Sequence, residues 1–358
     1  MDADADPHMG PEEFRRHGHA AIDWIADYWA GLDERPVLAD VEPGDIAGAL
    51  PTHAPEDPED FSQVLADLDE VVVPGLTHWQ HPRFFAYFPA NSSPAAILGD
   101  LLSSGIGTQG MLWATSPAAT ELEQVVLTWF GRALGLPEEL LGAPDRPGAT
   151  GGGVIQDTAS TATFTAILAA LHRASDGAVH DGGLAAIPGA CVYGSTQAHS
   201  SLVKGAMMAG LGADAVRQIA VDPATQAMRP DELRAAIDED VAAGRTPVLV
   251  QAAVGTTGTG AIDPVAAVAV IARDHGAWLH VDAAWAGVAA VCPEHRWVLD
   301  GVGEHADSLV TNPHKWLLTT FDCSTFWVRD RAALIGALSI LPEYLRNPAS
   351  ESGAVVDY

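Results

Sequence analysis

The sequence predicts an α/β fold in which a mainly parallel sheet carries helices on both faces. Two observations support this prediction. From about residue 158 onward, short apolar segments alternate with longer segments of helical periodicity. Polar or glycine-rich segments follow the ends of several apolar segments, which is where open parallel sheets bind ligands. Before residue 86 the pattern is helical without strands, so an N-terminal helical arm is expected.

The arm is predicted from the spacing of its apolar residues. Apolar side chains recur at helical intervals over residues 12–32, and a second short helix is expected over 61–72. A connector rich in proline and aspartate, 35–60, separates the two. A segment with so few strands cannot form its own sheet, so we expect it to pack on another body, such as a second subunit.

The rest of the chain is expected to alternate between helix and strand. Ser116 is a predicted helix cap and Pro117 the first helical residue of a helix over 116–134. Further helices are predicted over 158–174, 199–209, 230–243 and 264–275. Strands are predicted over 191–193, 216–221, 247–254, 277–281, 307–311 and 325–328.

Composition argues against several classes of function. The formal net charge is −29, with 47 acidic and 18 basic residues, which disfavours binding to nucleic acid or to anionic membrane surfaces. No uncharged apolar run reaches the roughly 18 residues that a membrane span requires. The three cysteines are isolated and the acidic N-terminus does not resemble a signal peptide, so we expect a cytoplasmic protein.

Lysine is rare in this chain, and one lysine lies in an unusual place. Only Lys204 and Lys315 occur. Lys315 follows the apolar stretch 308–310 and precedes Trp316, whereas Lys204 is interpreted as a solvated charge on a helix. A desolvated lysine can form an imine with a carbonyl compound, which arginine cannot readily do. The sequence therefore marks Lys315 as a candidate nucleophile.

Other candidates follow predicted strands or open predicted helices. Asp282 ends an apolar strand and is followed by small residues, so its carboxylate could pair with the protonated nitrogen of a flat ring or cap a helix. His199 could stack on a ring, transfer protons or serve as a helix cap. The glycines 151–153, followed by the hydroxyl-rich stretch 158–160, resemble an anion site at a helix N-terminus, although a flexible turn has the same composition.

Three other site types are disfavoured. The stretch 255–260 is glycine-rich and follows a strand, but it lacks the Gly-x-Gly-x-x-Gly spacing of a dinucleotide site. The pairs His17/His19 and His78/His81 do not match the His-Glu-x-x-His zinc pattern, so no metal site is predicted. No Gly-x-Ser-x-Gly turn of a serine hydrolase is present.

Taken together, the motifs resemble the pyridoxal-phosphate-dependent group II decarboxylases, the family of aromatic-L-amino-acid decarboxylase. The resemblance runs in family order across nearly the whole chain, and the six segments together are highly specific. They are His81-Pro-Arg-Phe-Phe-Ala-Tyr-Phe-Pro89, Trp113-Ala-Thr-Ser-Pro-Ala-Ala-Thr-Glu-Leu-Glu123, Gly151-Gly-Gly-Val-Ile-Gln156, Gln197-Ala-His-Ser-Ser201, His280-Val-Asp-Ala-Ala284 and Asn312-Pro-His-Lys-Trp-Leu-Leu318.

The resemblance implies a fold-type-I transferase-like architecture, a homodimer, and decarboxylation of an L-amino acid with pyridoxal 5'-phosphate as cofactor. Lys315 would hold the cofactor covalently, Asp282 would pair with its ring nitrogen, and His199 would stack on its ring. The residues implied around the cofactor are Thr158, Ala159, Ser160, His199, Thr257, Asp282, Ala284, Asn312, His314 and Lys315.

By the same resemblance the chain would divide into an arm for dimer contact (1–85), a large cofactor-binding domain (86–335) and the start of a linker and mobile loop (336–358). Members of the family continue into a small C-terminal domain, so a truncated chain is expected. The last residue, Tyr358, matches the proton donor of the mobile loop and is the fourth implied catalytic residue, with Lys315, His199 and Asp282.

The implied substrate pocket favours an aromatic amino acid. Ala90 stands where the aromatic decarboxylases often carry threonine, and two further positions depart from the apolar or aromatic residues of the family. The pocket positions are Trp79, Tyr87, Phe88, Pro89, Ala90, Gln109 and Met111.

Three alternatives remain open from the sequence. The first is an acidic or aliphatic substrate, and Arg83 is the arginine near the pocket motif that could receive a side-chain carboxylate. The second is a sibling activity that forms an aldehyde. The third, from another class of function, is a shortened chain that dimerises without catalysis.

Overall fold

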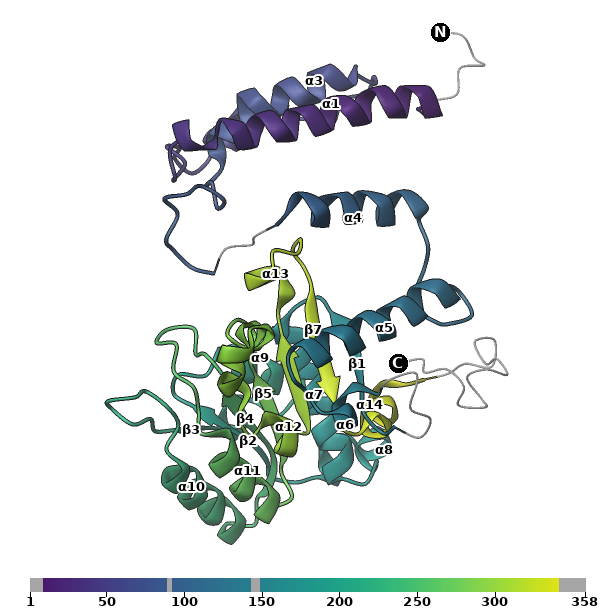
Figure 1. The fold of residues 1–358 in the computed structure, drawn as a ribbon. Helices are drawn as coiled ribbons and strands as arrows, with labels where there is room; N and C mark the ends of the chain where they lie inside the picture. Colours follow the sequence, from purple (N-terminus) through teal and green to yellow (C-terminus); the bar gives the residue numbers. More distant parts are fainter. Residues whose placement is uncertain (1–8, 89–91, 143–148, 341–358) are drawn as a thin grey trace. The chain divides into compact units, whose positions relative to one another are not determined.

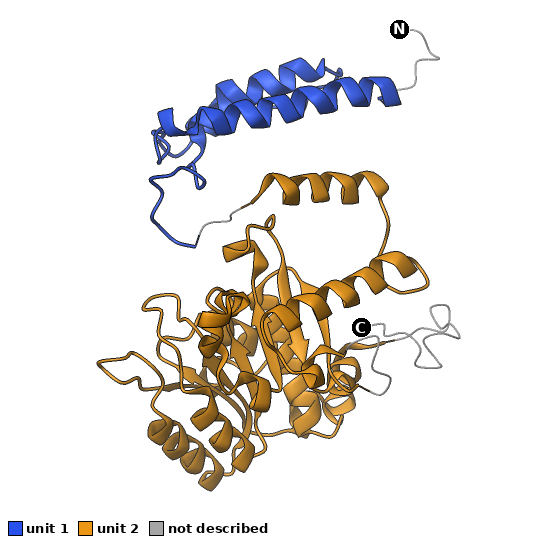
Figure 2. Ribbon diagram, in the orientation of Figure 1, with its two compact units in different colours: residues 1–89 blue, residues 90–358 orange. Residues whose placement is uncertain are grey.

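The computed structural model describes residues 9–88, 92–142 and 149–340 (Figure 1). The chain forms two compact units, residues 1–89 and 90–358 (Figure 2). Each unit is described by itself below.

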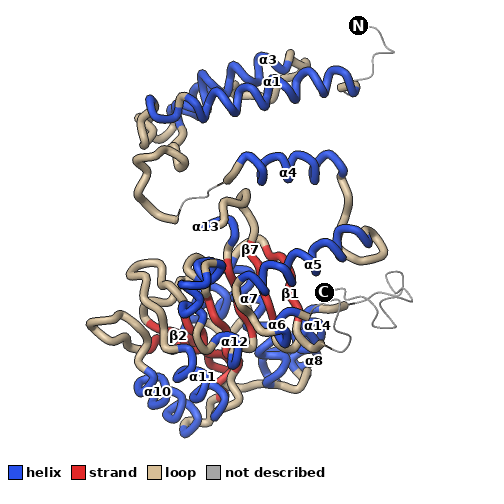
Figure 3. Tube along the Cα trace, in the orientation of Figure 1, coloured by secondary structure: helices blue, strands red, loops and turns tan. Residues whose placement is uncertain are grey.

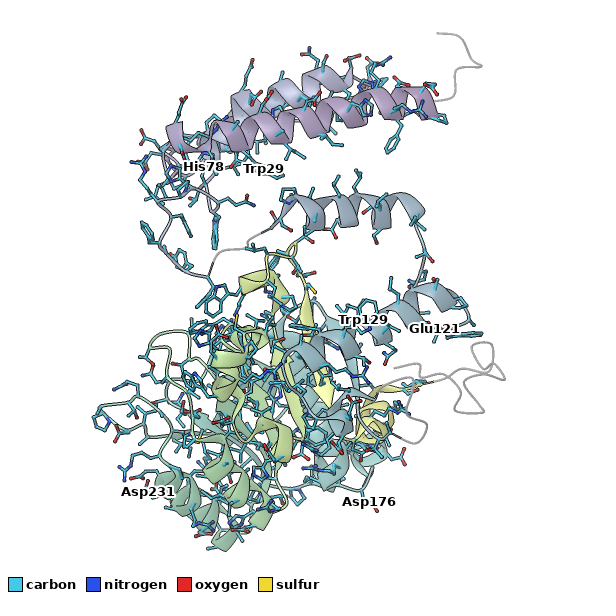
Figure 4. The ribbon with its side chains drawn as sticks, viewed as in Figure 1. Trp29, His78, Glu121, Trp129, Asp176 and Asp231 are labelled. Atoms are coloured by element: carbon cyan, nitrogen blue, oxygen red, sulfur yellow. The ribbon has the colours of Figure 1, made fainter. Side chains whose placement is uncertain are left out.

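The N-terminal unit is a small helical assembly. It consists of α1 (Pro11–Ala30), η1 (Leu32–Glu34), α2 (Asp45–Ala49), α3 (Phe61–Asp67), and the short turns η2 (Leu68–Val72) and η3 (Val73–Gly75). The Trp24 indole nitrogen donates to Asp69 Oδ1 at 3.2 Å, and the Tyr28 hydroxyl lies 2.7 Å from Nδ1 of His78, which is labelled in Figure 4. No residue of α1 is buried, so this unit has little apolar core of its own.

The C-terminal unit contains a seven-stranded sheet with the strand order β1-β7-β6-β5-β4-β2-β3. Its strands are drawn in red in Figure 3. The pairs β2–β3, β2–β4, β4–β5 and β5–β6 are parallel, whereas β7 runs antiparallel to both β6 and β1. The predicted mainly parallel sheet is thus confirmed. The strands are β1 (Gly152–Gln156), β2 (Ala190–Ser195), β3 (Val216–Ile219), β4 (Thr246–Ala253), β5 (Trp278–Asp282), β6 (Ser308–Thr311) and β7 (Ser324–Val328).

Helices cover both faces of this sheet. The long helices are α4 (Pro94–Ile106), α5 (Pro117–Ala133), α7 (Ala159–Ala174), α9 (Ser201–Met208), α10 (Pro230–Ala242), α11 (Val265–Asp274) and α14 (Arg331–Leu338). The single turns are α6 (Glu138–Leu141), α8 (Val179–Gly182), α12 (Val302–His305) and α13 (Pro313–Trp316), with η4 (Gly183–Ala186), η5 (Ala213–Ala215), η6 (Gly287–Val291) and η7 (Pro293–Leu299).

Two apolar cores result, one on each face of the sheet. Side chains of α7, α9 and α14 form one core, and side chains of α5, α10 and α11 form the other. Neighbouring strand residues alternate between the two: Leu309 lies in one core and Val310 in the other, and both are fully buried. Strands buried on both faces are typical of parallel sheets, which explains their continuous apolar runs.

Several elements were not predicted, among them the long helices α4 and α14 and the strand β1, and one interpretation was wrong. Helix α4 was missed, and β1 occupies the stretch that was interpreted as a glycine-rich phosphate turn. A side chain on Gly153 would come within 3.0 Å of the Trp327 ring, and one on Gly151 would meet the Glu139 carbonyl oxygen at 2.1 Å. These glycines therefore permit close packing of an edge strand and do not line a phosphate site.

No helix in the described parts of the chain is both long and apolar enough to cross a membrane.

Candidate active site

The carboxyl ends of the parallel strands border one cavity of about 210 Å³. Asp282 ends β5, Ala253 ends β4, and Asn312 directly follows β6. His199 follows β2, and Thr158 follows β1 and opens α7. The polar residues that the sequence places after separate strands therefore meet at one edge of the sheet, as the parallel topology requires.

Asp282 is a buried carboxylate held by two donors. Its side chain is 8% exposed, Oδ1 accepts from the backbone N–H of Ala284 at 3.1 Å, and Oδ2 accepts from Gln251 Nε2 at 3.2 Å. Two fixed donors on different oxygens set the plane of the carboxylate. The carboxylate lines the cavity and can serve a cationic partner there.

Lys315 lies on the one-turn helix α13, beside the same cavity. Burial lowers the pKa of its amine, and the Asp282 carboxylate opposes that shift. A lowered pKa makes the neutral, nucleophilic amine more available, as imine formation requires. Lys204, by contrast, is an exposed residue on α9 and does not line the cavity.

Three histidines near the site differ in surroundings. Burial lowers the pKa of His199, which the Asp282 carboxylate partly opposes, and His199 Nδ1 accepts from the Ser201 N–H at 3.2 Å. Burial lowers the pKa of His314, whose Nδ1 accepts from the Cys323 N–H at 2.9 Å. His280 is fully buried, and burial lowers its pKa to about 4, so its imidazole is neutral at pH 7.

The N-terminus of α7 borders the cavity. Thr158, Ala159 and Ser160 all line it, and Thr158 Oγ1 accepts from the Thr161 N–H at 3.3 Å as the helix cap. Helix N–H groups and hydroxyls together favour an anion such as a phosphate. The hydroxyl residues Thr158 and Ser160 line the cavity, whereas the preceding glycines 151–153 do not.

Asn312 directly follows β6 and is held by Ser324, the first residue of β7. The Ser324 hydroxyl donates to Asn312 Oδ1 at 2.7 Å, and Asn312 Nδ2 lies 3.3 Å from His314 Nε2. This small network holds the turn that leads into Lys315. Its members are buried, so the turn has a defined geometry.

Five residues of the cavity lining were not predicted: Ala253, Gly255, Thr256, Trp285 and Phe321. Gly255 has φ of +84°, and a side chain there would meet the Trp285 ring at 2.8 Å, so the turn after β4 requires glycine. Its position after a strand was a usable signal. The two aromatic residues, Trp285 and Phe321, gave no such signal, because no spacing pattern singles them out.

The predicted site residues fall into three groups. Every implied cofactor residue lines the cavity. Trp79, Tyr87 and Phe88 belong to the N-terminal unit, and Gln109 and Met111 lie between α4 and α5, outside the lining. Pro89, Ala90 and Tyr358 lie outside the described residues.

The donor set around the cavity fits pyridoxal phosphate. The amine of Lys315 matches its aldehyde, the carboxylate of Asp282 matches its ring nitrogen, and the start of α7 matches its phosphate. Within the described ranges, no cluster of three histidine, cysteine or acidic side chains could hold a metal ion.

Comparison with known proteins agrees with this geometry. The chain is 46% identical to phenylacetaldehyde synthase of Arabidopsis thaliana over 98% of this chain and 70% of that protein. It is 44% identical to tyrosine decarboxylase of Papaver somniferum, over 98% of this chain and 67% of that protein. The chain covers 64% of the length of another curated relative, so part of each of these proteins has no counterpart in this chain.

Solved structures show the same fold. The crystal structure of Catharanthus roseus tryptophan decarboxylase in complex with L-tryptophan aligns with a TM-score of 0.88 at 41% identity, covering 96% of this chain and 70% of that one. The Oryza sativa TDC structure with PLP and tryptamine aligns with a TM-score of 0.92 at 41% identity, covering 99% and 71%. The predicted fold-type-I architecture is therefore confirmed.

The model of the pyridoxal-dependent decarboxylase conserved domain matches residues 43–358. This match covers most of the chain, and it agrees with the relatives and with the composition of the cavity. The chain belongs to the pyridoxal-dependent decarboxylase family.

Proposed function

We propose that this chain carries out pyridoxal-phosphate-dependent decarboxylation of an aromatic L-amino acid to its amine and CO2. One observation supports this most strongly: Lys315, Asp282, His199 and the start of α7 border a single cavity. The substrate class is supported by the names of relatives that act on tyrosine and tryptophan.

Each cavity residue has a proposed role. Lys315 would bind the cofactor's aldehyde carbon through its amine, Asp282 would accept a hydrogen bond from the ring nitrogen, and His199 would lie against the ring. Thr158 and Ser160 would donate to the phosphate, and Asn312 and His314 keep the turn before Lys315 in place. Ala159, Thr257 and Ala284 complete the walls.

The reaction breaks the bond between the α-carbon and the carboxylate. When bound, pyridoxal phosphate supplies an electron sink for the pair released as CO2 departs. A proton then replaces the carboxylate at the α-carbon, and Tyr358 is the proposed donor. Asp282 would pair with the ring nitrogen, and its burial excludes water that would weaken this pairing.

Two of the substrate-contact residues that the family resemblance implies, Trp79 and Tyr87, belong to an aromatic cluster within the N-terminal unit. The Trp79 ring stacks on Phe84 and Tyr87 with centroid separations of 5.1 and 5.8 Å, and Tyr87 is 83% exposed. An exposed stack of this kind suits an aromatic side chain. Phe88, Pro89, Ala90, Gln109 and Met111 remain proposed pocket residues on the family resemblance alone.

A second candidate function is supported by several comparisons. Relatives that are 46% and 44% identical are named phenylacetaldehyde synthase, so the alternative product is an aldehyde in place of the amine. Aldehyde formation consumes oxygen, whereas simple decarboxylation does not. Product identity and oxygen uptake therefore separate the two reactions.

We further propose that the chain acts as a homodimer in the cytoplasm. Helix α4 buries none of its residues and exposes Leu98, Leu101, Leu102 and Ile106, an apolar surface that a second copy would cover. The free cysteines Cys191, Cys292 and Cys323 suit a reducing compartment. Sedimentation of the wild type beside Leu102→Asp tests the dimer: a monomer at all concentrations in the wild type contradicts it.

The function is tested by supplying the chain with pyridoxal phosphate and L-tyrosine, L-tryptophan, L-phenylalanine or L-glutamate. We expect CO2 and an amine from an aromatic substrate, with no product from Lys315→Ala. Lys204→Ala is the matched control, because it removes the other lysine, and should retain activity. Product from L-glutamate alone would favour the acidic alternative and a role for Arg83. Bound cofactor without any product would favour a non-catalytic chain.

A further inference from the structure

Gln251 is a polar side chain in the middle of the sheet, directly beneath the cavity. It lies on β4, is fully buried, and pairs in register with His280 on β5. It does not line the cavity itself. A buried amide at a central strand position costs stability unless it makes hydrogen bonds, so its presence requires an explanation.

The amide makes one side-chain hydrogen bond, and its partner is the site carboxylate. Gln251 Nε2 donates to Asp282 Oδ2 at 3.2 Å. Its Oε1 is buried and has no hydrogen-bond partner among the described residues. The fold thus leaves one acceptor unsatisfied while directing the donor to Asp282.

The orientation of the amide depends on the charge of Asp282. A rotated amide would place Oε1 against a carboxylate oxygen, and two acceptors at that distance repel each other. With the observed orientation, the N–H stabilises the ionised carboxylate and restrains Oδ2. The backbone N–H of Ala284 restrains Oδ1 in the same way.

We propose that Gln251 is a positioning residue, which holds the Asp282 carboxylate in the orientation that receives the cofactor's ring nitrogen. The inference rests on the proposed function, since it concerns how the chain holds pyridoxal phosphate. Gln251 acts through Asp282 and touches neither the substrate nor the cofactor.

The other groups around Asp282 do not take over this role. His280 on β5 is neutral and directs its ring nitrogens to Ser308 Oγ at 2.9 Å and Thr163 Oγ1 at 3.4 Å. The charged or titratable groups that face Asp282 across the cavity are His199 before α9 and Lys315 on α13. His199 and Lys315 line the cavity, whereas Gln251 donates to Asp282 from within the sheet.

The test uses apoprotein of the chain and pyridoxal phosphate as the probe. Gln251→Met keeps the length of the side chain and removes the donor. Leu249→Met is the matched control, because it alters a fully buried side chain on the same face of β4. The dissociation constant is measured by quenching of tryptophan fluorescence, and thermal unfolding reports stability separately.

We expect Gln251→Met to weaken cofactor binding about tenfold and Leu249→Met less than about twofold. In an Asp282→Asn background, Gln251→Met should have almost no further effect, because the neutral amide carries no charge to stabilise.

Two results would overturn the inference while leaving the proposed function intact. One is cofactor binding in Gln251→Met equal to that in Leu249→Met. The other is an equal loss from Gln251→Met with and without Asp282→Asn, which would indicate a purely structural role. Failure of the wild-type apoprotein to bind pyridoxal phosphate would overturn both the inference and the proposed function.

Discussion

Thr158 has two roles, and the loss of each can be measured separately. Its hydroxyl accepts from the Thr161 N–H at 3.3 Å as the cap of α7, and it lines the cavity where the cofactor phosphate is proposed to lie. A hydroxyl can accept one hydrogen bond and donate another, so both roles are compatible. Thr158→Ala removes both at once.

The two losses have different magnitudes. Loss of a threonine cap costs about 1 kcal/mol of unfolding free energy. Loss of a hydrogen bond to a charged phosphate costs about 1.5–3 kcal/mol, which corresponds to a ten- to hundredfold weaker binding of pyridoxal phosphate. Urea unfolding of the apoprotein measures the first quantity, and quenching of tryptophan fluorescence measures the second.

Ser93→Ala is the matched control for Thr158→Ala. Ser93 Oγ caps α4 by accepting from the Ala96 N–H at 3.3 Å, the same distance as in α7, and Ser93 does not line the cavity. Ser93→Ala should lower the free energy of unfolding by about as much as Thr158→Ala does, and it should leave cofactor affinity within about twofold of wild type. Equal cofactor affinity in the two variants would refute the assignment of the phosphate to the start of α7.

Three further predictions concern Asp240, Asp282 and Tyr358. Asp240→Asn should lower the unfolding free energy by about 2–3 kcal/mol in urea titrations, because the buried carboxylate accepts from Arg217 Nη2 at 2.6 Å and from the Tyr193 hydroxyl at 2.9 Å. Burial alone would raise the pKa of Asp240, but the hydrogen bonds from Arg217 and Tyr193 outweigh it and the net pKa is lowered. The contribution of Asp240 to the free energy of unfolding is therefore complete above the ordinary aspartate pKa of about 4, and it is lost as the pH falls through the lower pKa of the folded state. A difference in unfolding free energy between wild type and Asp240→Asn that grows as the pH falls would contradict this. Asp282→Asn should weaken cofactor binding at least about tenfold by fluorescence titration, and unchanged affinity would exclude its pairing with the ring nitrogen. Tyr358→Phe should lower the rate of amine formation while cofactor affinity stays the same, and an unaltered rate would remove Tyr358 as the proton donor.

The sheet and the cofactor end of the site were predictable because they depend on local patterns. Strands such as β5 are continuous apolar runs, and parallel strands place the residues that follow them at one edge. That rule alone predicted that Asp282, Lys315 and His199 lie at the same edge of the sheet. The antiparallel strand β7 does not disturb it, since its first residue, Ser324, meets Asn312 at the same edge.

Other features depend on packing that no local pattern encodes. Strand β1 was missed because its glycines, needed for contact with Trp327, resemble a turn. Gln251 was overlooked because a lone polar residue in an apolar strand gives no spacing signal, and only the register of β4 with β5 brings it to Asp282. The stacking of Trp79 on Phe84 and Tyr87 also depends on tertiary packing, which sequence spacing does not determine.

The central claim is that Lys315 is the residue that holds the cofactor. Its most direct test is reduction of the chain with borohydride in the presence of pyridoxal phosphate, followed by mass spectrometry of its peptides. Because the chain has only two lysines, the result is easily interpreted. The account predicts a pyridoxyl group on the peptide containing Lys315 and none on the peptide containing Lys204. A group on Lys204, or equal labelling of both lysines, would contradict it.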